Sequence, residues 1–279
     1  LQYIWKEVFN PKTQKREPIK RTICRLFCSY KENIYLTPEY MVFLESIKDE
    51  NKRRAWLYGD WDITSGGALD DVWSSSNVVP RFKIPSTWRV DRSFDWGSSH
   101  PFSVGWWAEA DGEEIVLPSG SRWAPVKGSL FRIYELYGAE DLDGGANRGL
   151  RAPPARIAEE IVAIERRLRE QGWINSYVQP GPADNQIHDV RDINTPTIAD
   201  EFRKFGIVWG RSDKSKGSRK IGLELTRQMV DNAKTGERPG LYVMQNCKAA
   251  LKLLPTVPRD EDDPDDVDTQ SPDHIYDDT

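Results

Sequence analysis

Ser93-Phe94-Asp95-Trp96-Gly97 ends a predicted β-strand, Trp88–Asp95, on an aspartate that local structure does not require. Two further acidic sites, Asp184 and the closing segment Asp273–Asp278, lie at or near the ends of other predicted elements, far along the chain. Three carboxylates brought together from distant parts of an α/β chain form a site for hard divalent cations, and two such cations can drive phosphodiester hydrolysis. The pattern therefore indicates a metal-dependent nuclease.

The segments after this strand predict a mixed sheet. Two more strands, Phe102–Ala108 and Leu130–Tyr137, complete an antiparallel meander. Helices and strands then alternate, and the expected ranges are a helix after Pro153-Pro154, a strand at Ile174–Gln179, a helix at Thr195–Phe205, a strand at Ile207–Gly210, a helix at Lys220–Ala233 and a strand at Leu241–Met244. This order predicts an α/β fold with a central first strand and helices on both faces, which is the order of elements in the RNase H-like fold.

Three of these helices carry local signals. Ile157, Ile161, Ile164 and Leu168 follow at spacings of four, three and four, so we expect them on one buried face. Thr195 is the expected cap of the next helix, with Pro196 at its first position. In the last helix we expect Ile221, Leu225 and Met229 to share the core-facing side.

The first third of the chain divides into a separate segment and a connection. Residues 1–65 are expected to form a small, mainly helical piece, with a helix that Thr37 caps and Pro38 begins. Residues 66–87 are expected to be a linker, because they contain Gly66-Gly67 and Ser74-Ser75-Ser76. The mixed-sheet domain is then expected at residues 88–279.

Composition limits the class of protein. The 279 residues include no apolar run of about 18, so no membrane span is expected. The chain starts at Leu1 without an initiator Met, which suggests a fragment of a longer protein. Three cysteines without a Cys-x-x-Cys pair argue against a disulfide framework or a zinc site and favour a reducing, cytoplasmic setting.

The net charge of −5 hides an asymmetry. Ten acidic residues and no Lys or Arg lie between Asp260 and Asp278, and the rest of the chain holds 34 acidic and 39 basic residues. A mildly basic body is compatible with nucleic-acid binding, although a solvated surface beside an acidic tail gives the same balance.

Four blocks together resemble a known family, the large subunit of the DNA-packaging terminase of tailed bacteriophages. Phe94-Asp95-Trp96-Gly97 with His100-Pro101 is similar to the first motif of its nuclease domain, and Gly181-Pro182-Ala183-Asp184 to the second. Asp273–Asp277 is similar to the third. Residues 29–61 resemble the closing segment of the family's ATPase region. The resemblance implies that residues 1–65 as a whole are the C-terminal segment of that region.

The resemblance implies a two-metal site with Mg²⁺ or Mn²⁺. Asp95, Asp184 and Asp277 would bind the ions, and His274 lies one helical turn before Asp277. Three aspartates compete for two of these roles: Asp189 is a rival for Asp184, and Asp273 and Asp278 are rivals for Asp277. Asp278 is therefore kept as a candidate metal ligand, and His274 can also be an ordinary surface histidine.

The resemblance also implies partners and a setting. The domain would cut concatemeric double-stranded DNA and work with its own ATPase domain, the small terminase subunit and the portal protein. It would be monomeric alone, oligomeric as a ring on the capsid, and located in the host cytoplasm, transiently at the procapsid portal. The phosphate-binding sequence of an ATPase motor, Gly-x-x-x-x-Gly-Lys-Ser/Thr, does not occur in the 279 residues.

A basic loop precedes the last predicted helix. Five cations that suit phosphate contacts lie between positions 211 and 220, namely Arg211, Lys214, Lys216, Arg219 and Lys220. An ordinary exposed loop would have the same composition. Two alternatives remain for the whole chain: another RNase H-like nuclease of the resolvase or transposase type, and a non-catalytic DNA-gripping module whose acidic cluster is structural.

Overall fold

The computed structural model describes two compact units, Leu1–Ser65 and Gly66–Thr279. Within them the described residues are 2–10, 15–23, 30, 33, 35–46, 57, 67–142, 148–175, 177–190, 192, 194–260, 263, 265–268, 271 and 273–279. The boundary between the units coincides with the expected end of the first segment.

The first unit contains more strand than helix among its described residues. Strands β1 (Gln2–Asn10) and β2 (Lys15–Ile23) pair antiparallel along their whole length. Helix α1 (Pro38–Glu45) has only 8 residues, so the expectation of a mainly helical segment is wrong. The sequence of β1 is rich in aromatic and β-branched residues, which favour strands. The expected cap is present, because Thr37 accepts a hydrogen bond from the backbone N–H of Tyr40. Cys24, Cys28 and most of the terminase-like block 29–61 lie outside the described residues.

The second unit is built on a mixed sheet, as expected. Its strands run in the order β11-β10-β4-β5-β8-β12-β3, and β9 also pairs with β4. The central strands β4 (Arg89–Asp95), β5 (Ser103–Glu109) and β8 (Leu130–Tyr137) form the antiparallel meander. The other strands pair parallel, and their bounds are β3 Val78–Val79, β9 Val178–Gln179, β10 Pro182–Ala183, β11 Gly210–Arg211 and β12 Leu241–Met244. A separate hairpin joins β6 (Ile115–Val116) to β7 (Arg122–Trp123).

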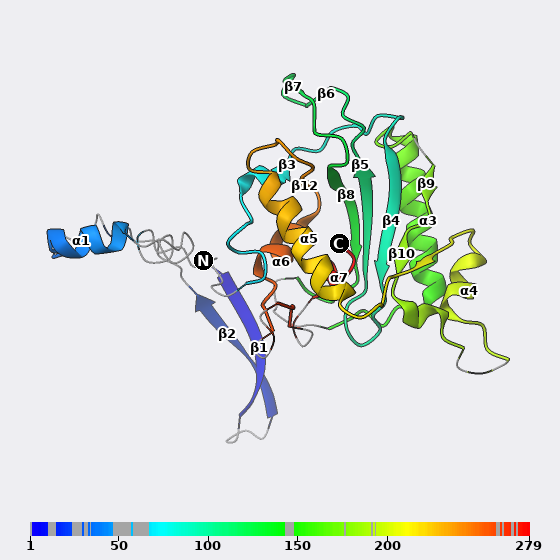
Figure 1. The fold of residues 1–279 in the computed structure, drawn as a ribbon. Helices are drawn as coiled ribbons and strands as arrows, with labels where there is room; N and C mark the ends of the chain where they lie inside the picture. Colours follow the sequence, from blue (N-terminus) through cyan, green and yellow to red (C-terminus); the bar gives the residue numbers. More distant parts are fainter. Residues whose placement is uncertain are drawn as a thin grey trace. The chain divides into compact units, whose positions relative to one another are not determined.

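Helices cover both faces of this sheet (Figure 1). Six of the seven residues of β5 are buried, and side chains alternate between the faces of a strand, so neither face of β5 is open to solvent. Helix α3 (Pro154–Glu170) lies on the face of β4 that carries Arg92, because Glu165 pairs with that arginine. The four predicted apolar residues of α3 are all buried. The short helix α7 (His274–Asp277) lies on the opposite face, where Ser93 and Asp95 point.

Residues 67–87 are part of the second unit, and the expectation of a linker is wrong. Strand β3 extends the sheet beside β12, and Phe82 and Ile84 belong to the core. Asn77 is fully buried and donates hydrogen bonds to the carbonyl oxygens of Val230 and Leu241. The segment contains glycine and serine clusters, but its buried apolar residues determine how it packs.

Two later helices differ in detail from their predictions. Helix α4 (Ile198–Arg203) begins after Thr197, because Thr197 and Asp200 form a capping box that Thr195 lacks. Helix α5 (Ser218–Asn232) buries Leu223 and Val230, whereas Ile221 and Leu225 are exposed. The apolar residues of α5 occupy more than one face, so periodicity did not identify the buried side. Helix α6 (Lys248–Leu253) and the single 3₁₀ turns η2 (Ser75–Asn77), η3 (Asn185–His188) and η4 (Leu254–Thr256) complete the unit. Among the described residues, no helix has the length and apolar character of a membrane span.

Candidate metal centre

The strand pairing brings Asp95 and Asp184 to the same edge of the sheet. Asp95 is the last residue of β4, and β10 pairs parallel with β4 through Ala183 and Phe94. The N–H of Asp184 then donates to the carbonyl oxygen of Phe94 at 2.9 Å. Gly181 allows this approach, because a Cβ there would lie 2.0 Å from the carbonyl oxygen of Arg92.

Helix α7 adds the third carboxylate and a histidine. Nδ1 of His274 lies 2.7 Å from Oδ2 of Asp95. Asp277 is one turn further along α7 and faces the same cavity. Nε2 of His274 is buried and has no hydrogen-bond partner among the described residues.

These side chains line one cavity of about 430 Å³. Its polar lining residues include Asp95, Asp184, Gln186, Lys214, Arg219, Asp273, His274 and Asp277. A second hollow of about 540 Å³ continues along β10 and α5 and shares Asp95, Asp184, Lys214, Arg219 and Asp277 with the first. The three predicted metal ligands therefore stand where the two hollows meet.

The pKa values of the carboxyl groups reflect their burial and crowding. Burial raises the pKa of Asp95 to about 6, although the hydrogen bond with His274 acts in the other direction. Burial and the neighbouring Asp273 raise the pKa of Asp277 to about 7, against the opposing charge of Arg219. Burial lowers the pKa of His274, but the contact with Asp95 and the negative charges of Asp273 and Asp277 together raise it above its ordinary value. Burial, together with the neighbouring carboxylates, thus disfavours the charged forms of Asp95 and Asp277.

Arg219 and Lys220 do not have the surroundings expected of phosphate-binding residues. Arg219 points toward the acidic C-terminal segment, with Nε 2.7 Å from Oδ1 of Asp266 and NH2 3.2 Å from Oδ2 of Asp273 and 3.6 Å from Oδ1 of Asp277. Nζ of Lys220 lies 2.6 Å from Oδ2 of Asp263. The other three predicted DNA-binding residues, Arg211, Lys214 and Lys216, are exposed, and Lys214 also lines the cavity.

The structure distinguishes Asp189 and Asp278 from the residues that they rival, whereas Asp273 lines the same cavity as Asp277. Asp189 is exposed and follows η3, outside both hollows, whereas Asp184 lines both. Asp278, expected as a candidate metal ligand, is instead buried in an ion pair with Arg132. Oδ1 of Asp278 lies 2.5 Å from NH1 of Arg132, and its Oδ2 accepts hydrogen bonds from Ser103 and from NH2 of Arg132. Asp278 lies near the C-terminal end of the sequence in an acidic run, so the sequence did not indicate its pairing with Arg132.

Sequence reasoning did not identify Arg132 at all. It lies in Leu130-Phe131-Arg132-Ile133, where a charge stands between apolar neighbours. Such a residue requires a buried partner, and this requirement is the signal that could have found it.

The donor set suits a hard divalent cation. Carboxylate oxygens are the ligands that Mg²⁺ and Mn²⁺ prefer, and the unpartnered Nε2 of His274 is a further donor at the same place. Among the described residues, no three His, Cys, Asp or Glu side chains form a closed metal cluster, and the guanidinium of Arg219 faces the carboxylates of Asp273 and Asp277. The donor atoms are therefore of the type that binds a hard divalent cation. In this structure the positive charge next to Asp277 is the guanidinium of Arg219.

Comparisons with known proteins concern the fold. No protein-family model and no curated protein matches the chain. The nuclease domain of the P22 large terminase has 12% identity, with 77% of this chain and 89% of that chain covered and a TM-score of 0.49. A large terminase from a thermophilic bacteriophage has 13% identity, with 90% and 52% covered and a TM-score of 0.48, so this chain spans about half of its length. The large terminase nuclease of another thermophilic phage, G20c, solved with bound cobalt, has 11% identity, with 76% and 94% covered and a TM-score of 0.42. These three structures match between 76% and 90% of this chain.

Proposed function

We propose that this chain is the metal-dependent endonuclease domain of a viral DNA-packaging terminase large subunit. The observation that carries the proposal is the convergence of Asp95, Asp184 and Asp277, from three separate elements, on one cavity with His274 hydrogen-bonded to Asp95. The substrate is double-stranded DNA, cut in concatemeric form by phosphodiester hydrolysis. Residues 1–65 then belong to the end of the ATPase region.

Each side chain has a role in this reaction. Asp95, at the centre of the sheet edge, is placed to serve as the shared ligand, and Asp184 and Asp277 flank it. His274 holds the Asp95 carboxylate in one orientation through Nδ1. Two Mg²⁺ or Mn²⁺ ions, when bound, supply a lowered pKa for the attacking water and charge stabilisation for the leaving oxygen. The carboxylate donors of the cavity support a hard divalent cation in this role.

The proposal includes the partners that such a nuclease needs. DNA would lie along the two adjoining hollows, with the exposed Lys214 and Lys216 beside its phosphates. The portal protein, the small terminase subunit and an ATPase domain would deliver the DNA, in an oligomeric ring on the capsid. The setting would be the host cytoplasm, with transient residence at the procapsid portal.

A plasmid cleavage assay tests the proposal. We expect nicking and linearisation in Mn²⁺ or Mg²⁺, loss of cleavage in chelator, and a decrease of more than about 100-fold in Asp95→Ala, because the shared ligand is lost. Asp189→Ala is the matched control, since this nearby aspartate is exposed and outside both hollows. Cleavage by Asp95→Ala at the wild-type rate would refute the proposal.

One observation favours a second function. The ion pairs of Arg219 with Asp266, Asp273 and Asp277 are what a structural acidic cluster would show, as in a DNA-gripping module without catalysis. The same assay separates the two functions, because a gripping module would retard DNA in a gel without cutting it in any divalent cation.

A further inference from the structure

Arg132 is a fully buried charge in the middle of the sheet. Its side chain, on β8, is 0% exposed, and so is the side chain of its partner Asp278. The guanidinium donates two hydrogen bonds to the carboxylate, from NH1 to Oδ1 at 2.5 Å and from NH2 to Oδ2 at 3.0 Å. A bidentate pair of this kind fixes direction as well as distance.

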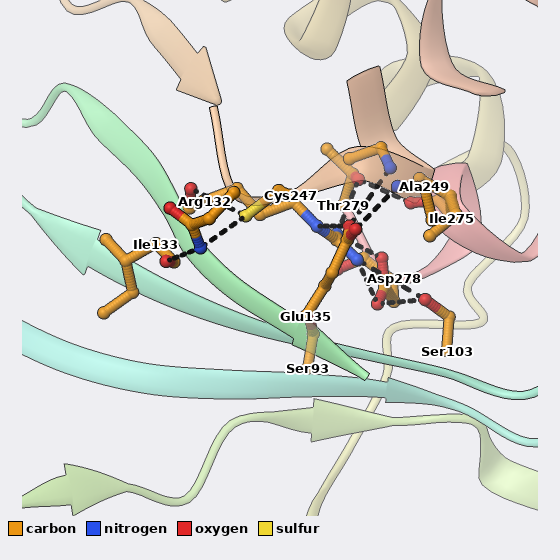
Figure 2. A network of polar contacts seen from close by, with 12 residues as sticks. Ser93, Ser103, Arg132, Ile133, Glu135, Cys247, Ala249, Ile275, Asp278 and Thr279 are labelled. Atoms are coloured by element: carbon orange, nitrogen blue, oxygen red, sulfur yellow. Dashed lines mark hydrogen bonds and ion pairs between the residues drawn. The ribbon is translucent and has the colours of Figure 1, made fainter. Parts of the chain in front are cut away.

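The surroundings are built to hold this pair (Figure 2). Ser103 on β5 donates to Oδ2 of Asp278 at 2.7 Å, and Ser93 on β4 donates to the backbone carbonyl oxygen of Asp278. Three adjacent strands therefore bind the residue that ends α7. Gly105 leaves the space that the guanidinium needs, because a Cβ there would lie 2.9 Å from NH1 of Arg132.

Two sides of α7 face different surroundings. A helix of four residues has little stability of its own, so its orientation depends on tertiary contacts. Ile275 and Asp278 are one turn apart and face the sheet, where both are buried. His274 and Asp277 are also one turn apart, about 100° round the helix from the first pair, and they face the cavity.

We propose that the Arg132–Asp278 ion pair orients α7, which makes Arg132 a positioning residue for the metal site although it does not line the cavity. This inference rests on the proposed function. Ile275 holds α7 against the core without a preferred direction, whereas the two hydrogen bonds and the ion pair set its rotation. Loss of the pair lets Asp277 and His274 leave the position opposite Asp95.

The test replaces both charges at once, in the double variant Arg132→Met/Asp278→Leu. Removing both partners leaves neither of them as a lone buried charge, and Glu135, which lies 3.5 Å from Nε of Arg132, keeps its hydrogen bonds from the backbone N–H groups of Ala249 and Ala250. The fold is therefore expected to survive, as a thermal melt will show. Mn²⁺ binding, followed by the electron paramagnetic resonance signal of free Mn²⁺, should weaken by about 10-fold or more. Hydrogen–deuterium exchange should become faster in the C-terminal peptide that contains α7, and cleavage should recover when Mn²⁺ is raised.

A second buried ion pair supplies the matched control. Arg92 and Glu165 join β4 to α3 at 2.7 Å, and in the part of the chain that the structure describes neither side chain forms a hydrogen bond or ion pair with α7. Arg92→Met/Glu165→Leu should therefore leave Mn²⁺ binding and the exchange of α7 unchanged. Unchanged Mn²⁺ binding in the Arg132/Asp278 variant would overturn the inference, as would equal weakening in both double variants.

The experiment has two further possible outcomes. If the Arg132/Asp278 double variant does not fold, Arg132→Lys keeps the charge but loses the two-pronged geometry, and unchanged Mn²⁺ affinity in that variant would overturn the inference. If the wild-type protein binds no Mn²⁺, the proposed function fails. The exchange rates of α7 then still decide whether the ion pair orients the helix, because that measurement needs no metal.

Discussion

Asp277 and Asp278 are adjacent in the chain but occupy different surroundings. Asp277 lines the cavity beside Asp273 and His274, whereas Asp278 is buried against Arg132 and Ser103. Successive residues of a helix point about 100° apart, so one step along α7 changes the neighbours completely. His274 and Asp277, which the sequence places one helical turn apart, line the same cavity, whereas Asp278, kept from the sequence as a candidate metal ligand, pairs with Arg132.

Exchange of either carboxylate for an amide should separate the two roles. Asp277→Asn is expected to lower cleavage by more than about 100-fold while the melting temperature stays the same or rises, because a negative charge is removed from beside Asp273. Asp278→Asn leaves the buried guanidinium of Arg132 without its main counter-charge and is expected to cost about 3–5 kcal/mol of stability. Urea unfolding and a cleavage assay on both variants check this. A stable Asp278→Asn, or an active Asp277→Asn, would contradict the assignment.

At the scale of elements, the loop from β11 into α5 divides into two groups of cations. Lys214 and Lys216 are exposed, and they remain predicted phosphate contacts. Arg219 and Lys220 begin α5 and pair with aspartates of the C-terminal segment. Asp263, Asp266 and Asp273 therefore neutralise the start of this helix.

Lys214→Ala/Lys216→Ala should weaken DNA binding for all sequences alike. Each lost phosphate contact is expected to reduce the slope of log K against log salt by about 0.9. Lys234→Ala is the control, because Lys234 lies just beyond the C-terminal end of α5, away from this loop, and pairs with Asp231. Binding isotherms at several salt concentrations provide the slopes. Equal slopes for wild type and the double variant would assign the loop to a surface that does not contact DNA.

At the scale of the whole molecule, the boundary at residues 65 and 66 separates two compact units. Residues 67–87 belong to the second one, because β3 pairs with β12 and Leu69, Phe82 and Ile84 lie in its core.

A chain from Gly66 to Thr279 should therefore fold cooperatively, whereas one that starts at Trp88 should be severely destabilised. Loss of three large apolar side chains from the core is expected to cost more than about 5 kcal/mol, and the edge of β12 would be exposed as well. Urea unfolding of the two chains, followed by circular dichroism, measures the difference. Equal free energies of unfolding for the two chains would show that residues 67–87 act as a linker.

The sequence by itself predicted the features that depend on local periodicity and local signals. Strands β8 and β12 have the predicted bounds, and the buried face of α3 is the predicted one. The structure places Asp95, Asp184 and Asp277 at one cavity, as expected of residues that follow or end recognisable elements, and their role as metal ligands stays a prediction.

Only the tertiary structure decided which polar groups pair. Arg132 and Asp278 are 146 positions apart, and Arg219 and Asp273 are 54 apart, so no window of sequence contains both partners. The same holds for residues 67–87, whose short β3 gains its hydrogen bonds from β12, far along the chain. Composition marks such a segment as a connection, but burial of its apolar side chains against distant strands stabilises it as part of the sheet. The residues that line the candidate site could therefore be predicted from local sequence, whereas the groups that hold them in position could not.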